Sequence, residues 1–400
     1  MAICDRNVLA LSEAPAASAG RLSDRNKRLM NIPVAKPTLP PFDAFAILAK
    51  DIFDRRYVSN FSKYCDLLEG RASDLLGTEI RSVVSCDIGM TLAWRALELS
   101  KGEVIVPSFT FASTINAMAW NGLTPVFADI DPDTLCVDPG SVRALISPRT
   151  VAIAAMHCFG EPVSTKIDAI ASEHGLALLF DAAQAIGSTS GGRSMAGRGD
   201  ISVFSLSGTK VVTAGEGGLI SFANLETKER FLELRGYGFI GDYNAKAPGL
   251  NGKISEMNAA LGYLSFEMLD EMIADRARIA QRYRDRLAHL KSLRFQPAPP
   301  AGDTRSYKDL VIIFASKPLR QAVEQALTDQ QIGTKRYFFP AHQMVAYRHL
   351  PQPGSLAATE DLYGRALCVP IFSDLTDQDI DRIADLIESA LDTLRHQKIA

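Results

Sequence analysis

The sequence predicts an α/β protein with a mostly parallel central sheet and a smaller C-terminal α+β domain. Between residues 82 and 222, short apolar runs of strand length alternate with segments of helical length. Strands buried on both faces have nearly continuous apolar runs, and their alternation with helices is typical of a parallel sheet covered by helices. The last third of the chain mixes a strand-like run with an amphipathic helix.

The chain before the sheet divides into an arm and a first helix. Residues 1–30 are rich in Ala and Ser and poor in aromatic residues. They bury too little apolar surface to offset the entropy lost on ordering, so we expect a disordered arm. Prolines between residues 33 and 41 then favour an extended entry into a helix over about residues 42–54.

The expected strands of the sheet are short runs rich in β-branched or aromatic residues. They are residues 104–106, 125–128, 151–156, 177–180, 201–204 and 219–222. The helical segments between them are residues 88–99, 113–120, 139–146 and 166–174. Ligands of such folds bind beyond the carboxyl ends of the strands, so we expect a site there.

A long helix is expected after the sheet. Met257, Leu261 and Leu264 begin an apolar pattern of helical spacing that continues, with a bend, toward Leu290. We interpret this helix as a bridge between two lobes. The predicted division is a large domain over residues 31–264, followed over residues 265–400 by the bridging helix and a small domain. In the small domain we expect a strand at residues 310–314 and a final helix after Asp374.

Composition excludes several classes of protein. The chain has 43 Lys and Arg against 46 Asp and Glu, so no excess charge indicates nucleic acid or an anionic membrane as a partner. The 6 cysteines form no metal-binding motif, and we expect buried, reduced thiols and no metal. The longest apolar runs are much shorter than the ~18 residues of a membrane span. The apolar stretch near the N-terminus is too short for a secretory signal, so we expect a cytoplasmic protein.

The polar residues that indicate chemistry lie at the ends of two predicted strands. Asp181 follows the predicted strand at residues 177–180, within the run Phe-Asp-Ala-Ala-Gln-Ala at residues 180–185, and Ser205 and Lys210 follow the next strand. The strand-end rule brings these three side chains to one crevice. Taken singly, each has an ordinary alternative: a helix-capping aspartate, a strand-end serine and a surface lysine.

Together, these motifs resemble the DegT/StrS family of sugar aminotransferases, which use pyridoxal 5'-phosphate (PLP) and have the fold-type I aminotransferase fold. The resemblance covers about residues 32–394. It also includes Val104–Phe111, Pro125–Asp131, Asn251–Met257 and Lys335–Tyr347. Several motifs in the matching order carry the resemblance, where any one of them would be weak.

The resemblance implies that Lys210 and Asp181 are the catalytic residues. Lys210 is expected to bond to the PLP aldehyde and later to carry a proton, because an amine in a partly desolvated pocket stays nucleophilic. Asp181 is expected to pair with the N–H of the ring, which keeps the ring an electron sink.

Further cofactor contacts are implied in the same way. Gln184 is expected to reach the phenolic oxygen of the ring, Phe111 to stack on its face, and Ser205 to offer a hydroxyl to the phosphate. The alternatives are a helix-surface glutamine, a core phenylalanine and a strand-end serine.

The phosphate requires donors at a helix N-terminus, where the sequence departs from the family pattern. Cys86-Asp87-Ile88-Gly89 stands where relatives usually have Gly-Thr-Ala or Ser-Gly-Thr. A carboxylate beside a phosphate is repelled by roughly 1–4 kcal/mol. We therefore expect Asp87 to cap the helix and the amides of Ile88 and Gly89 to face the phosphate.

A homodimer with composite sites is also implied, in which Asn251 reaches the phosphate of the other subunit. Lys253, Lys335 and Arg336 are candidates to pair with a substrate diphosphate, with solvated surface charge as the alternative. His342 either contacts the sugar or packs.

The implied reaction moves the amino group of L-glutamate to a nucleotide-linked 4-keto-6-deoxyhexose, with dTDP as the expected nucleotide, in deoxyaminosugar and surface-polysaccharide biosynthesis. Residues 210–216 resemble the corresponding segment of the family members that act on 4-keto sugars. The resemblance extends to members that form dTDP-4-amino-4,6-dideoxyglucose. Three alternatives stay open: a 3-keto sugar aminotransferase, a PLP-dependent sugar dehydratase and a catalytically silent scaffold. The retained lysine favours transamination over dehydration, because dehydratases of the family have histidine at this position.

Overall fold

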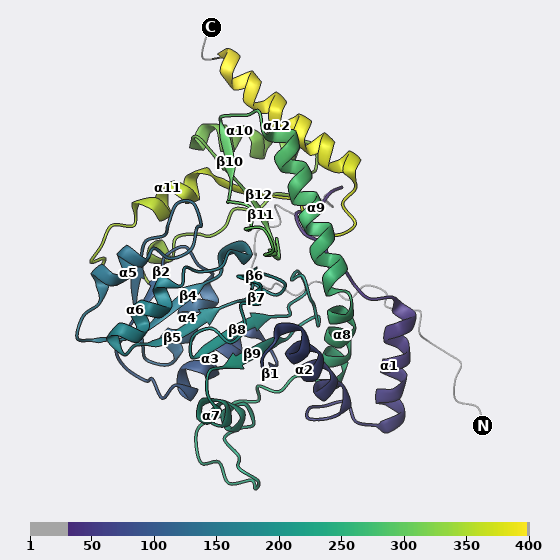
Figure 1. Ribbon diagram of the computed structural model, residues 1–400, viewed down its shortest axis with the longest axis vertical. Helices are drawn as coiled ribbons and strands as arrows, with labels where there is room; N and C mark the ends of the chain where they lie inside the picture. The colour runs from purple at the N-terminus through teal and green to yellow at the C-terminus, as the bar shows by residue number, and fades with distance from the viewer. Residues whose placement is uncertain (1–30, 398–400) are drawn as a thin grey trace, which may run out of the picture.

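The computed structural model describes residues 31–397, which carry a seven-stranded sheet, a three-stranded sheet and a two-stranded hairpin. In Figure 1 the seven-stranded sheet lies in the lower half, and helix α9 (Leu269–Leu287) runs from it toward the three-stranded sheet above. The expected N-terminal arm lies outside the described residues. No helix between residues 31 and 397 combines the length and apolar character needed to span a membrane.

The seven-stranded sheet has the strand order β1-β9-β8-β5-β4-β2-β3. The strands are β1 (Ile80–Val83), β2 (Glu103–Pro107), β3 (Thr124–Ala128), β4 (Thr150–Met156), β5 (Ala177–Asp181), β8 (Ile201–Ser205) and β9 (Gly218–Phe222). From β8 to β3 all neighbours pair in parallel, whereas β9 is antiparallel to both β8 and β1. The prediction of a mostly parallel sheet is confirmed. Strand β1 escaped prediction because Arg81 and Ser82 interrupt its apolar run.

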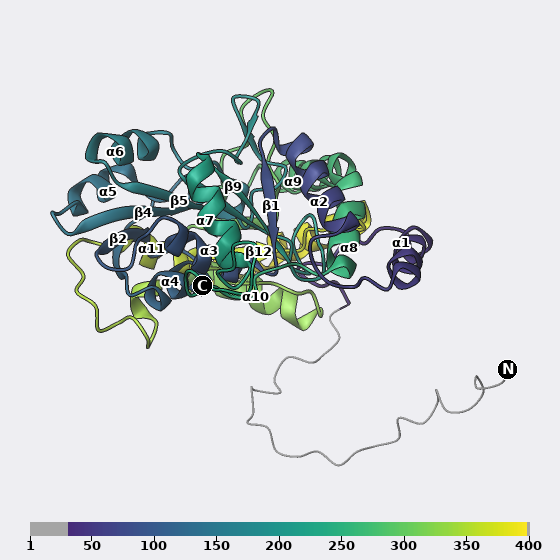
Figure 2. The same ribbon diagram turned by 90° about the horizontal axis from the view of Figure 1, so that it is seen from below.

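Helices cover both faces of this sheet, as predicted. One face packs against α3 (Cys86–Ala96), α4 (Ala112–Trp120) and α7 (Leu225–Arg235), and the other against α5 (Pro139–Leu145) and α6 (Lys166–His174). Figure 2 shows α5 and α6 on one side of the strands and α4 on the other. Val104 and Val106 of β2 belong to one core cluster and Ile105 to the other, as the two-residue period of a strand requires.

The long helical pattern forms two helices rather than one. Helix α8 (Glu256–Glu267) is followed by Met268, whose φ of −98° and ψ of 3° are not helical, and α9 begins at the next residue. Helix α8 packs against α2 (Lys63–Leu76), and α1 (Phe42–Arg55) lies beside it. The structure therefore has a break where the sequence predicts one helix with a bend, close to the domain boundary that the sequence predicts. The division into domains itself stays a prediction.

The smaller, C-terminal part combines an antiparallel sheet with helices. Its elements are β10 (Leu293–Phe295), β11 (Leu310–Phe314), α10 (Lys317–Asp329), α11 (Ala357–Arg365), β12 (Ala366–Val369) and α12 (Asp377–Gln397). The predicted strand and final helix are confirmed. Ile32, near the start of the described chain, packs into the same core as Ile312 and Ile387, so this segment crosses the predicted domain division. The remaining short elements are β6 (Thr189–Ser190), β7 (Arg193–Ser194), η2 (Cys158–Gly160) and η3 (Ala341–Gln343).

Candidate active site

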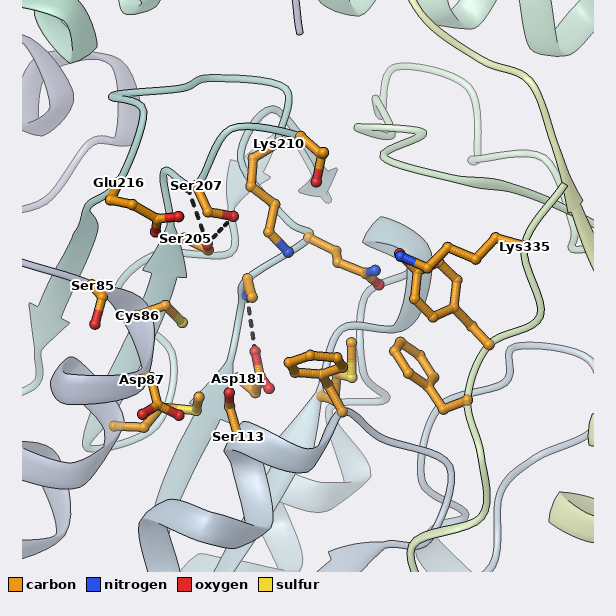
Figure 3. A pocket seen from close by; sticks show the side chains of 18 residues that line it. Ser85, Cys86, Asp87, Ser113, Asp181, Ser205, Ser207, Lys210, Glu216 and Lys335 are labelled. Atoms are coloured by element: carbon orange, nitrogen blue, oxygen red, sulfur yellow. Dashed lines mark hydrogen bonds between the residues drawn. The ribbon is translucent and has the colours of Figure 1, made fainter. Parts of the chain in front are cut away.

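The carboxyl ends of β5 and β8 open into a cavity of about 300 Å³. Asp181, Ser205 and Lys210 line it from the sheet side, and Lys335 and Tyr337 line it from the segment between α10 and η3. Figure 3 shows the side chain of Lys210 directed into the space above Asp181, with Lys335 on the opposite side of the cavity from Ser205. The strand-end rule thus brings together the residues that the sequence predicts to meet.

Asp181 is the last residue of β5 and is 2% exposed. Thr114 Oγ1 donates to its Oδ2 at 2.5 Å, and the amide of Ala183 donates to its Oδ1 at 3.0 Å. Burial raises the pKa of Asp181, while these two hydrogen bonds and the charge of Lys210 act in the opposite direction. A carboxyl held in this way favours a ligand that brings a positively charged N–H. Thr114 was missed by the sequence reasoning, because it lies on α4 and no local motif links it to Asp181.

Lys210 follows a tight turn after β8, in which its amide donates to the carbonyl of Ser207 at 2.9 Å. Burial lowers the pKa of Lys210, and the nearby ammonium of Lys308 lowers it further, against the charge of Asp181. A lower pKa increases the fraction of neutral amine near neutral pH. Neutral amine is the nucleophilic form that attacks an aldehyde.

The N-terminus of α3 forms another wall of the cavity, and it corrects the expectation for Ile88 and Gly89. Ser85 is the N-cap: its Oγ accepts from the amide of Ile88 at 3.2 Å, and its carbonyl accepts from the amide of Gly89 at 2.9 Å. Both predicted phosphate donors are therefore engaged. The amides of Cys86 and Asp87, in the first turn, have no acceptor within the helix and are left for an anion. Asp87 does not cap the helix, and its exposed side chain lines the cavity.

Hydroxyl groups complete this anion-binding end of the cavity. Ser205 Oγ donates to Ser207 Oγ at 3.3 Å and accepts from the amide of Ser207 at 3.3 Å. In Figure 3 both serines lie on the side of the cavity near Ser85 and Cys86. Ser207 and Thr209 line the cavity but were not predicted, although they belong to the same sequence run as Ser205 and Lys210. Amides and hydroxyls of this kind suit a phosphate.

Gln184 and Phe111 line the same cavity. Gln184 is 5% exposed, which excludes the alternative of a surface glutamine. Its Oε1 accepts from the amide of Phe159 at 2.7 Å, and its Nε2 donates to Asp309 Oδ2 at 3.2 Å. Phe111 is 54% exposed at the start of α4, which excludes the alternative of a core residue. Its exposed ring is available to a planar ligand.

The candidate cations Lys335 and Arg336 lie in different surroundings. Lys335 lines the cavity, with its ammonium 4.4 Å from the centre of the Tyr337 ring. Arg336 instead stacks over Tyr363 at 4.4 Å and donates to the carbonyl of that residue at 3.3 Å. Its expected pairing with a substrate diphosphate is therefore not supported in this chain, because its guanidinium faces α11.

His342 packs between two parts of the chain and does not line the cavity. Its Nδ1 lies 2.6 Å from Ser108 Oγ, and its Nε2 lies 3.0 Å from Glu360 Oε1. Ser108, the residue after β2, is fully buried. The packing alternative for His342 is the one that the geometry supports, because both ring nitrogens are engaged by protein groups.

Asn251 and Lys253 lie outside the cavity of their own chain. Lys253 Nζ donates to Asn251 Oδ1 at 2.6 Å and lies 3.9 Å from the centre of the Tyr237 ring. Lys253 lines a separate surface hollow beside α7. Neither residue lines the cavity of Lys210 in its own chain.

The chemistry of the cavity fits PLP. The buried carboxyl of Asp181 could pair with the ring nitrogen, and the amine of Lys210, with its lowered pKa, could react with the aldehyde. The exposed ring of Phe111 could stack on the cofactor ring. The anion-binding end between α3 and Ser205 suits the phosphate.

Comparison with known proteins gives consistent results. A model of the DegT/DnrJ/EryC1/StrS aminotransferase family matches residues 47–388. The dTDP-4-amino-4,6-dideoxy-D-glucose transaminase of Shigella dysenteriae is 32% identical over 371 residues, which cover 91% of this chain and 98% of that protein. The crystal structure of DesI in the presence of its TDP-sugar product superposes with a TM-score of 0.85 at 33% identity, over 92% of this chain and 96% of DesI. The aminotransferase TlmJ from Streptoalloteichus hindustanus superposes with a TM-score of 0.86 at 29% identity, over 91% of this chain and all of TlmJ.

Proposed function

Because this chain belongs to the DegT/DnrJ/EryC1/StrS aminotransferase family, we propose that it moves the amino group of L-glutamate to a dTDP-linked 4-keto-6-deoxyhexose. It is a PLP-dependent sugar aminotransferase with the fold-type I aminotransferase fold. The donor, the nucleotide and the position of the keto group are the parts that we propose. The observation that carries the proposal is the amine of Lys210 and the buried carboxyl of Asp181 at one cavity, in a chain similar to enzymes named for dTDP-linked 4-amino sugars.

PLP supplies an aldehyde that carries the amino group and a ring that accepts electrons. In the proposed mechanism, Lys210 Nζ holds the cofactor at its aldehyde carbon. As a free amine, Nζ would move the proton at the substrate carbon that bears the amino group, a task that suits an amine of lowered pKa. Asp181 holds the proton on the ring nitrogen, and Thr114 holds the carboxylate in place.

The remaining contacts orient the cofactor. We propose that the amides of Cys86 and Asp87 and the hydroxyls of Ser205 and Ser207 bind the phosphate. The Asp87 carboxylate is exposed, so water reduces its repulsion of the phosphate. Lys335 at the cavity wall suits an anionic substrate, a property that glutamate and a nucleotide diphosphate share.

The two half-reactions test the proposed substrates separately. We expect L-glutamate alone to bleach the visible absorbance of the bound cofactor, and a dTDP-linked 4-keto-6-deoxyhexose to restore it, because the amino group is stored between the two steps. Absorbance spectroscopy and product mass spectrometry measure both steps. The matched controls are the 3-keto isomer and the free 4-keto sugar. Restoration by a control alone would contradict the 4-keto or nucleotide assignment, and an unchanged spectrum with every amino donor would contradict amino transfer.

We also propose a homodimer in which each site takes Asn251 from the partner subunit. The segment before Asn251 projects below α7 in Figure 1 and exposes large side chains: Tyr243 is 94% exposed, Ile240 49% and Tyr237 44%. Exposed apolar patches of this kind are typical of protein interfaces. A twofold dimer would then contain two equivalent sites.

Subunit mixing tests this composite site. Lys210→Ala and Asn251→Asp proteins are each expected to be nearly inactive, since the new carboxylate repels the phosphate. After subunit exchange, the mixture should recover about a quarter of the wild-type activity, because half of the dimers are mixed and each has one intact site. The control pair, Lys210→Ala with Asp181→Asn, should recover nothing, because both residues belong to the same chain's site. No recovery for the first pair, with exchange demonstrated, would assign Asn251 to another role.

A further inference from the structure

A second buried lysine lies beside Lys210. Lys308 and Asp309, each 3% exposed, form an ion pair in which Lys308 Nζ lies 3.0 Å from both carboxylate oxygens. A second, much smaller hollow is lined by Lys308 and Lys210 together with Gln184. Two lysine side chains therefore line the same small space, one from the turn after β8 and one from the segment before β11.

The stability of the fold does not account for this pair. Burying two charges costs the hydration of both, and apolar side chains of similar volume are often at least as stable. Removing only one partner is costly, because the other charge is then buried without compensation. A buried ion pair at this position is better explained by what it does to its neighbours in the cavity.

Asp309 orients the amide of Gln184. A carboxylate only accepts hydrogen bonds, so Gln184 Nε2 faces Asp309, and the amide of Phe159 only donates, so Gln184 Oε1 faces Phe159. The two contacts leave one orientation for the side-chain amide. Nε2 has two hydrogens, and only one is used by Asp309. The other is available to an acceptor in the cavity that Gln184 lines.

We propose that the Lys308–Asp309 pair is a positioning element of the active site, in which Asp309 orients Gln184 and Lys308 places a second positive charge beside the Lys210 amine. The assignment of Lys210 as the reacting amine rests on the proposed function. Lys308 and Asp309 are positioning residues, because they act through Gln184 and Lys210.

The charged groups around Lys210 determine the expected direction of each effect. Burial lowers the pKa of Lys210, the charge of Lys308 lowers it further, and Cys86, Asp181 and Asp309 oppose this change. Asp87, Glu216 and Lys335 also line the cavity. Removing Lys308 takes away a positive charge and leaves the negative charge of Asp309 uncompensated. Each of these two effects raises the pKa of Lys210. Replacing Asp309 with asparagine leaves Lys308 uncompensated and lowers it.

The test measures the Lys210 amine directly in the full-length chain, freed of cofactor by dialysis against hydroxylamine. Trace acetic anhydride modifies lysines in their neutral form, and peptide mass spectrometry quantifies modification of Lys210 over a pH series. We expect the midpoint of this profile to rise by about one pH unit in Lys308→Met and to fall in Asp309→Asn. The matched control is Lys228→Met on α7, which removes a lysine paired with Glu79 and should leave the profile unchanged.

Two results would overturn the proposal. One is a Lys210 profile that neither substitution moves. The other is a shift of both variants toward the ordinary lysine pKa of about 10.4, which would mean that water enters the cavity. Asp309→Asn preserves the shape of the side chain, so it carries the test alone if Lys308→Met does not fold. The measurement needs neither cofactor nor sugar, so its outcome is independent of whether the proposed substrates react.

Discussion

Replacement of Lys210 by alanine is expected to lower kcat for amino transfer by about 10³-fold or more, because it removes both the covalent attachment and the proton carrier. Lys210 has the lowered pKa and the position in the cavity that both tasks require. Steady-state and single-turnover kinetics measure the loss.

A covalent label gives a second readout for Lys210. Borohydride reduction of the wild-type protein should fix the cofactor on the peptide that contains Lys210, and no peptide of Lys210→Ala should carry it. Lys335→Ala is the matched control, since Lys335 lines the same cavity and its variant should keep the label on Lys210. A label on Lys335 or Lys308 in the wild-type protein would contradict the assignment of the reacting amine.

The second large effect is expected for Asp181→Asn, which preserves the shape of the side chain but removes its charge. A charge pair at about 4 Å is worth about 4 kcal/mol at an effective dielectric constant of 20, so kcat should fall by about 10³-fold. The physical reason is that the ring nitrogen loses the group that keeps it protonated, and the ring then accepts electrons poorly. The kinetics of the glutamate half-reaction measure this loss.

Thr114→Val tests the support of the Asp181 carboxylate and complements Asp181→Asn. It removes one hydrogen bond to the carboxylate, which is worth about 1.5–3 kcal/mol when the acceptor is charged, so a loss of roughly tenfold or more is expected. Because Thr114 acts through Asp181, the same substitution should have a much smaller effect in the Asp181→Asn background. Equal losses in both backgrounds would show that Thr114 acts independently. An Asp181→Asn enzyme with wild-type kcat would contradict the role of the carboxylate.

Much of the large sheet could be predicted from local patterns. Val104–Val106 and Val151–Met156 are continuous apolar runs of strand length, a pattern typical of strands buried on both faces. Where the pattern is broken, prediction failed: β1 contains Arg81 and Ser82, and the apolar residues of α2 are interrupted by charges. The break between α8 and α9 was expected only as a bend, because Met268 continues the helical spacing although its backbone leaves the helix.

The sequence by itself determined the fold class and the meeting of Lys210 with Asp181 at one crevice. Strand length, apolar period and strand-end position are visible in the local sequence. Because ligands bind at the carboxyl ends of parallel strands, these features also predict where the site lies. Only the tertiary structure decided the contacts across long separations. Thr114 lies 67 residues before Asp181, and Gln184 lies 125 residues before Asp309.

The anion-binding end of the cavity shows the same division. The sequence located it at the start of α3, but which amides are free depended on the backbone conformation of Ser85, which caps the helix and engages Ile88. The sequence left two roles open for His342, contact with the sugar and packing. The contacts of its two ring nitrogens with Ser108 and Glu360 support packing. Local sequence encodes burial and periodicity, whereas the partner of a polar side chain is set by how distant elements pack, and that is decided only when the whole chain has folded.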